Sequence, residues 1–115
     1  MQKMSVVFAV LFFSGLAQAA PALFSPEAGV LCDKKAGFCA DSQGISMGLT
    51  QVHLGDKAQA KLLKVFGSTD GVDMGSYTLS NGVHCESSEK QCYKDRYFPR
   101  TKESKYSAML FKQGK

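Results

Sequence analysis

Four cysteines and two histidines are the side chains of this 115-residue chain that could bind a metal ion or carry out redox chemistry. The cysteines fall into two pairs with six residues between the members of each pair. Structural zinc sites usually pair cysteines about two to four residues apart, and redox sites usually use Cys-x-x-Cys. The spacing fits neither arrangement, so we predict no metal and no cofactor. The cysteines are Cys32, Cys39, Cys85 and Cys92.

Hydrolytic chemistry has equally little support in the sequence. A serine or cysteine nucleophile needs a base and an orienting partner, and no strained-turn motif such as Gly-x-Ser-x-Gly presents one. His84 stands next to Cys85, so we expect it to point away from the cysteine side chain as a partly exposed strand residue. His53 is expected at the surface or at the edge of the core. We therefore predict that the protein is not an enzyme.

The segment Tyr93–Arg100 is the part of the chain whose composition best suits binding. It interleaves aromatic side chains with Lys and Arg, which are residue types enriched at binding hot spots. The alternative is that its aromatic side chains pack inward while the charged neighbours face water. The predicted contact residues are Tyr93, Lys94, Arg96, Tyr97 and Arg100.

Charge is distributed unevenly along the chain. Residues 90–115 carry eight Lys and Arg against two carboxylates, whereas residues 20–89 carry five Lys against eight carboxylates. The C-terminal part is therefore suited to an anionic partner, although solvated lysines that maintain solubility would give the same pattern. A small net positive charge on an exported chain argues against nucleic acid. The predicted partner is an unidentified protein or an anionic polymer of the envelope or extracellular space.

The first nineteen residues have the features of a secretion signal. Lys3 supplies the positive start, Val6–Leu16 is mainly apolar, and Ala17-Gln18-Ala19 offers small residues for cleavage. We predict cleavage after Ala19 and a mature chain, residues 20–115, that forms one small disulfide-stabilised domain. The apolar run is shorter than the ~20 residues of a spanning helix, so no membrane anchor is predicted in the mature chain. The predicted location is the periplasm, with the cell surface or the exterior as alternatives.

The two cysteine pairs belong to a repeated pattern, Gly-Val-x-Cys-acid-x5-Cys, which begins at Gly29 and again at Gly82. In an oxidising compartment four cysteines indicate two disulfides, with three connectivities open. A four-residue loop at 34–37 would place Cys32 opposite Cys39, within disulfide reach. Chain entropy favours longer loops, by about 4 against about 2.5 kcal/mol. Geometry and the repeat favour the local pairs Cys32–Cys39 and Cys85–Cys92.

The remaining elements follow from periodicity and turn signals. Residues 22–24 suit an edge strand, whereas residues 45–54 fit both a strand and a helix. A helix is predicted from a cap at Asp56 to Gly67, with Gln59 in a variant capping box. Its apolar face comprises Ala58, Leu62, Val65 and Phe66, and a short C-terminal helix carries Tyr106, Met109 and Leu110.

These elements predict an α+β fold, in which two disulfide-braced β-hairpins form a small antiparallel sheet covered by one main helix. The hairpins make an internal pseudo-repeat. After them we expect the halves to diverge, the first into the helix and the second into a basic tail.

Several segments together resemble a known family. They are the segments 25–33, 39–46, 49–55, 80–85 and 92–98, which include both cysteine pairs and Cys92-Tyr93-x-Asp95-Arg96-Tyr97-Phe98. They are similar to the Fels prophage protein-like (YcgJ-like) family of small exported enterobacterial proteins. The resemblance implies a periplasmic or surface-exposed bacterial protein with disulfides, and it implies no activity or catalytic residue. Our leading hypothesis is a non-catalytic binding module. The alternative is an inhibitor of an incoming enzyme such as lysozyme, and an envelope hydrolase is the least favoured.

Overall fold

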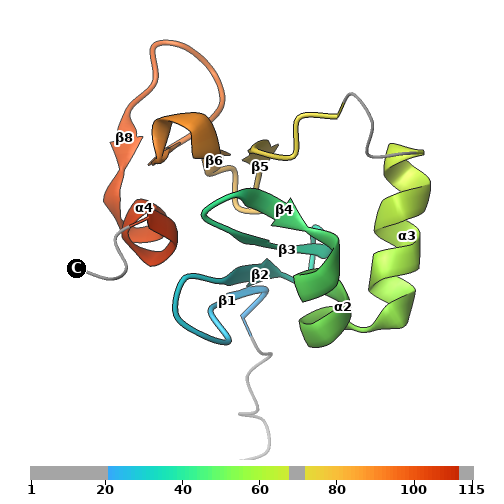
Figure 1. Cartoon of the computed structure of the whole chain (residues 1–115). Helices are drawn as coiled ribbons and strands as arrows, with labels where there is room; N and C mark the ends of the chain where they lie inside the picture. The colour runs from blue at the N-terminus through green and yellow to red at the C-terminus, as the bar shows by residue number, and fades with distance from the viewer. Residues whose placement is uncertain (1–20, 68–71, 112–115) are drawn as a thin grey trace, which may run out of the picture.

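The structure, a computed structural model, describes residues 21–67 and 72–111 (Figure 1). The predicted signal peptide and its cleavage site lie outside these residues. The described residues form two four-stranded antiparallel sheets, three α-helices and a 3-10 helix. This confirms the predicted α+β class and both disulfide-braced hairpins. The hairpins lie in separate sheets instead of sharing one, because each of them acquires two further strands.

The first sheet is followed at once by two helices. Its strands pair in chain order, and β4 continues into α2 without a loop. Residues 45–54 therefore contain both a strand end and a helix, which explains why the two periodicities overlap there. The elements are β1 (Leu23–Phe24), β2 (Leu31–Asp33), β3 (Phe38–Asp41), β4 (Gly44–Ser46), α2 (Met47–Leu54) and α3 (Asp56–Phe66).

The second sheet has the same order of strands and also ends in a helix, which confirms the predicted C-terminal helix. Its elements are β5 (Ser76–Thr78), β6 (His84–Glu86), the 3-10 helix η2 (Ser87–Glu89), β7 (Gln91–Tyr93), β8 (Lys102–Glu103) and α4 (Ser104–Phe111).

Both disulfides join facing residues of a central hairpin, which confirms the local pairing. Cys32 faces Cys39 in the β2–β3 pair, and Cys85 faces Cys92 in the β6–β7 pair. Each hairpin turns through four residues and ends in a left-handed residue, Gly37 or its counterpart in the second hairpin. Gly37 has a φ of 89°, a conformation that glycine adopts without a steric penalty.

The pseudo-repeat extends past the hairpins into the helices. In the first half, the backbone N–H of Cys39 donates to Thr50 Oγ1 at 2.9 Å, and that hydroxyl donates to the carbonyl of Ser46 at 2.7 Å. Ser46 faces Cys39 across the β3–β4 pair and also caps α2, because its side chain accepts from the N–H of Leu49. One buried threonine thus ties the helix to the disulfide strand.

The second half repeats this arrangement. The N–H of Cys92 donates to Ser107 Oγ at 2.7 Å, and the hydroxyl donates to the carbonyl of Glu103, which faces Cys92 across the β7–β8 pair. The carboxylate of Glu103 then accepts from the N–H of Tyr106 in the first turn of α4. The expectation that the second half continues as a basic tail is wrong, because β8 and α4 correspond to β4 and α2.

The start of α3 differs from the predicted capping box. Gly55, with a φ of 103°, occupies the cap position, and Asp56 is the first helical residue. The carboxylate of Asp56 accepts from Gln51 Nε2, while Gln59 Nε2 donates to the carbonyl of Met47. Both predicted cap residues therefore bond to α2, because the two helices meet at a tight corner.

The predicted apolar face of α3 is correct only in part. Leu62 is buried and Phe66 packs against the core, but Val65 is 74 % exposed. Since Val65 precedes Phe66 by a single residue, it points about 100° away from it around the helix. Gly67 ends the helix as predicted, with its N–H donating to the carbonyl of Leu63.

One apolar core joins the two halves. It draws buried residues from both sheets, and the rings of Phe38 and Tyr77 meet edge to face with centroids 5.6 Å apart. The fully buried carboxylate of Asp33 crosses between the halves and accepts from both the N–H and the hydroxyl of Ser80, at 2.6 and 2.8 Å. The sheets are therefore connected by polar bonds as well as by packing.

Candidate functional site

The connection between β7 and β8 is the place where the second half departs most from the first. Residues 42–43 suffice to connect β3 with β4, whereas residues 94–101 connect β7 with β8. We call residues 94–101 the β7–β8 loop. Its ends are held together because the N–H of Lys94 donates to the carbonyl of Thr101 at 2.8 Å. The additional residues project away from the sheet (Figure 1).

The tip of the loop presents two aromatic side chains to solvent. Tyr97 is 67 % exposed and Phe98 is 79 % exposed. The carboxylate of Asp95 accepts from the N–H of Tyr97 at 3.0 Å, and the Arg96 guanidinium lies 5.5 Å from the centre of the Tyr97 ring. The alternative in which the aromatic side chains of this segment pack inward is therefore wrong for the tip. The strand also ends at Tyr93, so alternation between two faces does not apply beyond it.

The base of the loop is held by Arg100. Its guanidinium lies 4.3 Å from the centre of the Phe98 ring and 5.2 Å from that of Tyr93. Nη2 of Arg100 also lies 3.7 Å from Glu86 Oε2, and the arginine side chain is only 16 % exposed. Tyr93 donates its hydroxyl to Glu89, and this hydrogen bond is the main reason that the pKa of Tyr93 is raised.

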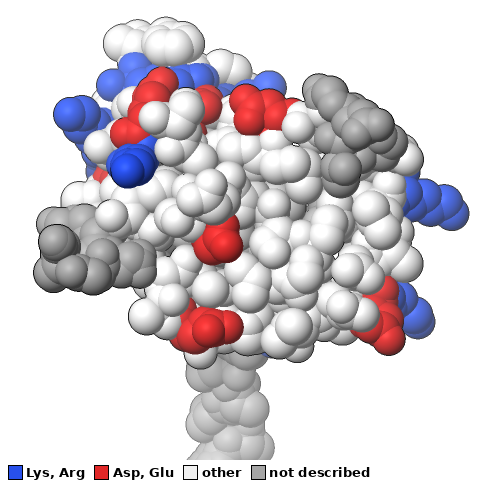
Figure 2. Space-filling model, in the orientation of Figure 1, with Lys and Arg blue, Asp and Glu red and all other residues white. Residues whose placement is uncertain are grey.

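The predicted contact residues therefore fall into two groups. Lys94, Arg96 and Tyr97 are exposed in the loop, whereas Tyr93 and Arg100 are half-buried and support it from below. Phe98, the most exposed aromatic side chain of the tip, is not among the predicted contact residues. Its position directly before Pro99, where a strand pattern cannot continue, was the available signal. Figure 2 shows the resulting surface: Lys and Arg gather over the loop, among a few carboxylates and beneath an uncharged projecting tip.

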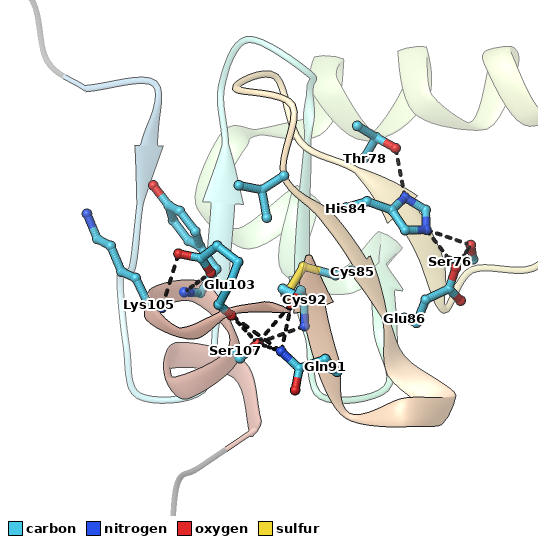
Figure 3. The surroundings of a disulfide bond; sticks show 12 residues. Ser76, Thr78, His84, Cys85, Glu86, Gln91, Cys92, Glu103, Lys105 and Ser107 are labelled. Atoms are coloured by element: carbon cyan, nitrogen blue, oxygen red, sulfur yellow. Dashed lines mark hydrogen bonds and ion pairs between the residues drawn. A yellow bond between two sulfur atoms is a disulfide. The ribbon is translucent and has the colours of Figure 1, made fainter. Parts of the chain in front are cut away.

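A polar network of Ser76, Thr78, His84 and Glu86 lies on β5 and β6 (Figure 3), and Glu86 connects it to Arg100 at the base of the loop. His84 Nε2 lies 2.6 Å from Glu86 Oε2 and 3.4 Å from Ser76 Oγ, while His84 Nδ1 lies 2.9 Å from Thr78 Oγ1. The prediction that His84 is partly exposed is wrong, because it is only 7 % exposed. The two hydroxyls and the carboxylate supply the polar partners that allow it to be buried.

Glu86 has its pKa set by opposing effects. Burial acts to raise the pKa of Glu86, but hydrogen bonds from His84 and Ser76 and the charges of His84 and Arg100 outweigh it, so the pKa is lowered. The carboxylate is thus held ionised as the link between the network and Arg100. Through it, the network braces the base of the loop.

The network has the residue types of a hydroxyl, a base and an orienting carboxylate, but its geometry favours bracing. Glu86 and Ser76 share one nitrogen of His84, and Thr78 takes the other, so each ring nitrogen already has a partner. His53 bonds to Glu27 at 2.9 Å, far from this network in the chain.

Among residues 21–67 and 72–111, no three His, Cys, Asp or Glu side chains gather to hold a metal ion. Within the same residues, no helix has both the length and the apolar character to span a membrane.

The chain is similar to proteins of one known family. Residues 23–111 match the family described as YcgJ protein. The chain is 42 % identical over 90 residues to the Escherichia coli (strain K12) protein named "Uncharacterized protein YcgJ". The aligned region covers 76 % of this chain and 69 % of that protein. No solved structure matches the chain significantly. The narrower resemblance to Fels prophage proteins stays a prediction.

Proposed function

We propose that this chain, which belongs to the YcgJ family, is a non-catalytic binding module whose contact surface is the β7–β8 loop. The proposal includes export with cleavage after Ala19 and action in the periplasm or at the cell surface. The partner is an anionic protein or polymer of the envelope. The observation that carries the proposal is the exposure of Tyr97 and Phe98 at the tip of a loop that is rich in Lys and Arg.

The comparison between the two halves supports this assignment. Two residues close the β3–β4 hairpin, so the longer β7–β8 loop is not needed to complete a sheet of this design. Hairpin loops usually have about two to five residues, so residues 94–101 make a longer connection than a hairpin needs. A loop that exposes two large aromatic side chains without a folding requirement is best explained by contact with a partner.

The chemistry of the loop also indicates the kind of partner. Tyr97 and Phe98 offer flat apolar surface, and Lys94 and Arg96 offer exposed positive charge beside it. Aromatic and arginine side chains dominate binding hot spots, whereas charges at the rim mainly increase the association rate. We expect a partner with negative groups around an apolar or planar contact, and binding that weakens as salt is added.

The test is affinity capture from envelope and extracellular extracts with oxidised mature protein. The variant Arg96→Gln/Tyr97→Ser/Phe98→Ser removes the exposed tip and leaves Arg100, which supports the fold, in place. We expect at least a tenfold loss of affinity, since each hot-spot side chain contributes about 2 kcal/mol or more. The matched control is Val52→Ser/Leu63→Ser, which also removes exposed apolar side chains but from the helices of the first half.

Retention of the partner by the loop variant would refute the proposal, as would equal loss from the control. The lysozyme-inhibitor alternative is separated by a muramidase assay with the same proteins. Inhibition that the loop variant lacks would identify the partner as that enzyme, and no inhibition at high excess would remove that alternative.

A further inference from the structure

A second surface lies on the first half, away from the β7–β8 loop. It is a groove of about 420 Å³ between α3 and the β2–β3 turn, residues 34–37. Pockets of about 300–1,000 Å³ are typical of small-ligand sites. No sequence pattern indicates this groove, because its two walls come from segments about twenty residues apart in the chain.

The floor of the groove is apolar. It consists of Leu54 at the end of α2 and of Ala58, Leu62 and Val65 along α3. Leu62 is anchored in the core, whereas Val65 is 74 % exposed and extends the floor toward the C-terminal end of the helix. An exposed valine in line with a buried leucine gives an elongated apolar strip, which suits a hydrocarbon chain better than a compact polar molecule.

The rim of the groove is cationic on both walls. Lys34 and Lys35 come from the turn, Lys57 and Lys61 come from α3, and no carboxylate is among the residues that line the groove. The Lys34 ammonium lies 5.5 Å from the centre of the Phe24 ring, which holds it near the turn. This concentration of positive charge occurs in the part of the chain, residues 20–89, where carboxylates outnumber lysines. Within the first half, residues 21–67, five lysines stand against four carboxylates, and four of those lysines line the groove.

The turn that forms one wall is fixed before any ligand arrives. The Cys32–Cys39 disulfide closes its base, and the N–H of Gly37 donates to the carbonyl of Asp33 at 2.8 Å. The Asp33 carboxylate accepts from the N–H of Ala36 at 3.0 Å while it also bonds to Ser80. A wall that is already ordered loses little conformational entropy when a ligand binds.

We propose that the groove between α3 and the β2–β3 turn binds a single-chain anionic amphiphile of the fatty-acid type. The acyl chain lies on the strip from Leu54 to Val65, and the carboxylate head lies among the lysines of the rim. A cationic amphiphile of the same length meets four like charges, and a short carboxylate lacks the apolar contact. The site is independent of the β7–β8 loop and does not rest on the function proposed for it.

The test is an NMR titration of ¹⁵N-labelled oxidised mature protein with decanoate. Decyltrimethylammonium keeps the chain and reverses the charge, and acetate keeps the head and removes the chain. We expect saturable shifts at Ala58, Lys61 and Val65 with decanoate, and at least tenfold weaker effects with either of the other probes. Lys57→Gln/Lys61→Gln should raise the Kd for decanoate about three- to tenfold, because exposed ion pairs are individually weak.

The matched control is Lys64→Gln/Lys102→Gln, which removes the same charge from residues that do not line the groove and should change the Kd less than twofold. Val65→Ser, at an exposed position, should weaken decanoate binding without affecting the fold. Absent or non-saturable binding of decanoate overturns the proposal. So does equal binding of decyltrimethylammonium, or an equal effect of the control. Because the loop variant keeps the groove, it should bind decanoate normally, so failure of either proposal leaves the other testable.

Discussion

Replacement of Thr50 by valine tests whether the link between helix and disulfide strand stabilises the fold. Thr50 is fully buried, and its hydroxyl accepts from the N–H of Cys39 and donates to the carbonyl of Ser46. Valine has nearly the same shape, so Thr50→Val removes the hydroxyl with little change in volume. The N–H of Cys39 then faces a methyl group in the interior. The carbonyl of Ser46 keeps a partner, because in an α-helix it accepts a hydrogen bond from the backbone N–H four residues later.

The expected cost follows from this single orphaned donor. A buried polar group left without a partner destabilises a protein by about 1–3 kcal/mol. Because the Ser46 carbonyl keeps a partner, we expect a loss of about 2 kcal/mol for Thr50→Val. With a urea dependence of about 1–3 kcal/mol per molar for a small domain, the unfolding midpoint should fall by about 1 M.

The assay is equilibrium unfolding in urea with both disulfides intact, followed by circular dichroism. Thr101→Val is the control, because it makes the same chemical change at an exposed loop residue and should stay within about 0.5 kcal/mol of the parent protein. Ser107→Ala should destabilise the second half comparably, since Ser107 accepts from Cys92 and from Gln91. If Thr50→Val unfolds at the same midpoint as Thr101→Val, the reasoning about the linked hydroxyls is wrong.

Two further predictions concern the network under the loop and the contact between the sheets. The lowered pKa of Glu86 stabilises the fold above the ordinary value of 4.5 and loses that effect as the pH falls through the lower folded value, so Glu86→Gln should reduce the loss of stability below pH 4.5. Urea midpoints across the acid range measure this, and an unchanged acid loss would contradict it. Gly44→Ala should cost several kcal/mol, because a Cβ there would collide with the carbonyl of Met74 at a φ of +123°. Gly55→Ala, at a φ of +103° with open space around it, should cost only about 1–2 kcal/mol in thermal unfolding, and equal costs would refute the packing argument.

The features predicted correctly from sequence are those set by residues close together in the chain. A four-residue turn brings Cys32 opposite Cys39, and the same spacing brings Cys85 opposite Cys92, so local geometry is enough to infer both disulfides. The end of α3 at Gly67 is likewise a local matter. The composition of the segment Tyr93–Arg100 favoured exposed aromatic side chains, and Tyr97 is exposed. Composition alone did not exclude aromatic side chains that pack inward.

The features that sequence did not reveal depend on side-chain contacts that no local pattern specifies, even where the partners are close in the chain. His84 is buried because Ser76, Thr78 and Glu86 satisfy its ring nitrogens, and no pattern around His84 identifies these partners. The role of Arg100 as a support follows from its contact with Glu86 and two rings. The correspondence of α4 with α2 was missed because it rests on hydroxyl positions in a helix and not on a repeated motif.

The two halves serve as references for each other, and this bears on where function lies. Each half needs four strands, one disulfide and one helix held by a hydroxyl, and these parts occur twice. Besides the short 3-10 helix η2, two parts of the described residues occur once: α3, which follows α2, and the β7–β8 loop, which replaces a two-residue turn. Both carry exposed apolar side chains beside positive charge, Val65 near Lys61 and Tyr97 near Arg96. If the repeated parts supply most of the fold, the exposed side chains of the unrepeated parts are free to serve binding, and variants confined to those exposed side chains should lose ligands while they keep the parental stability.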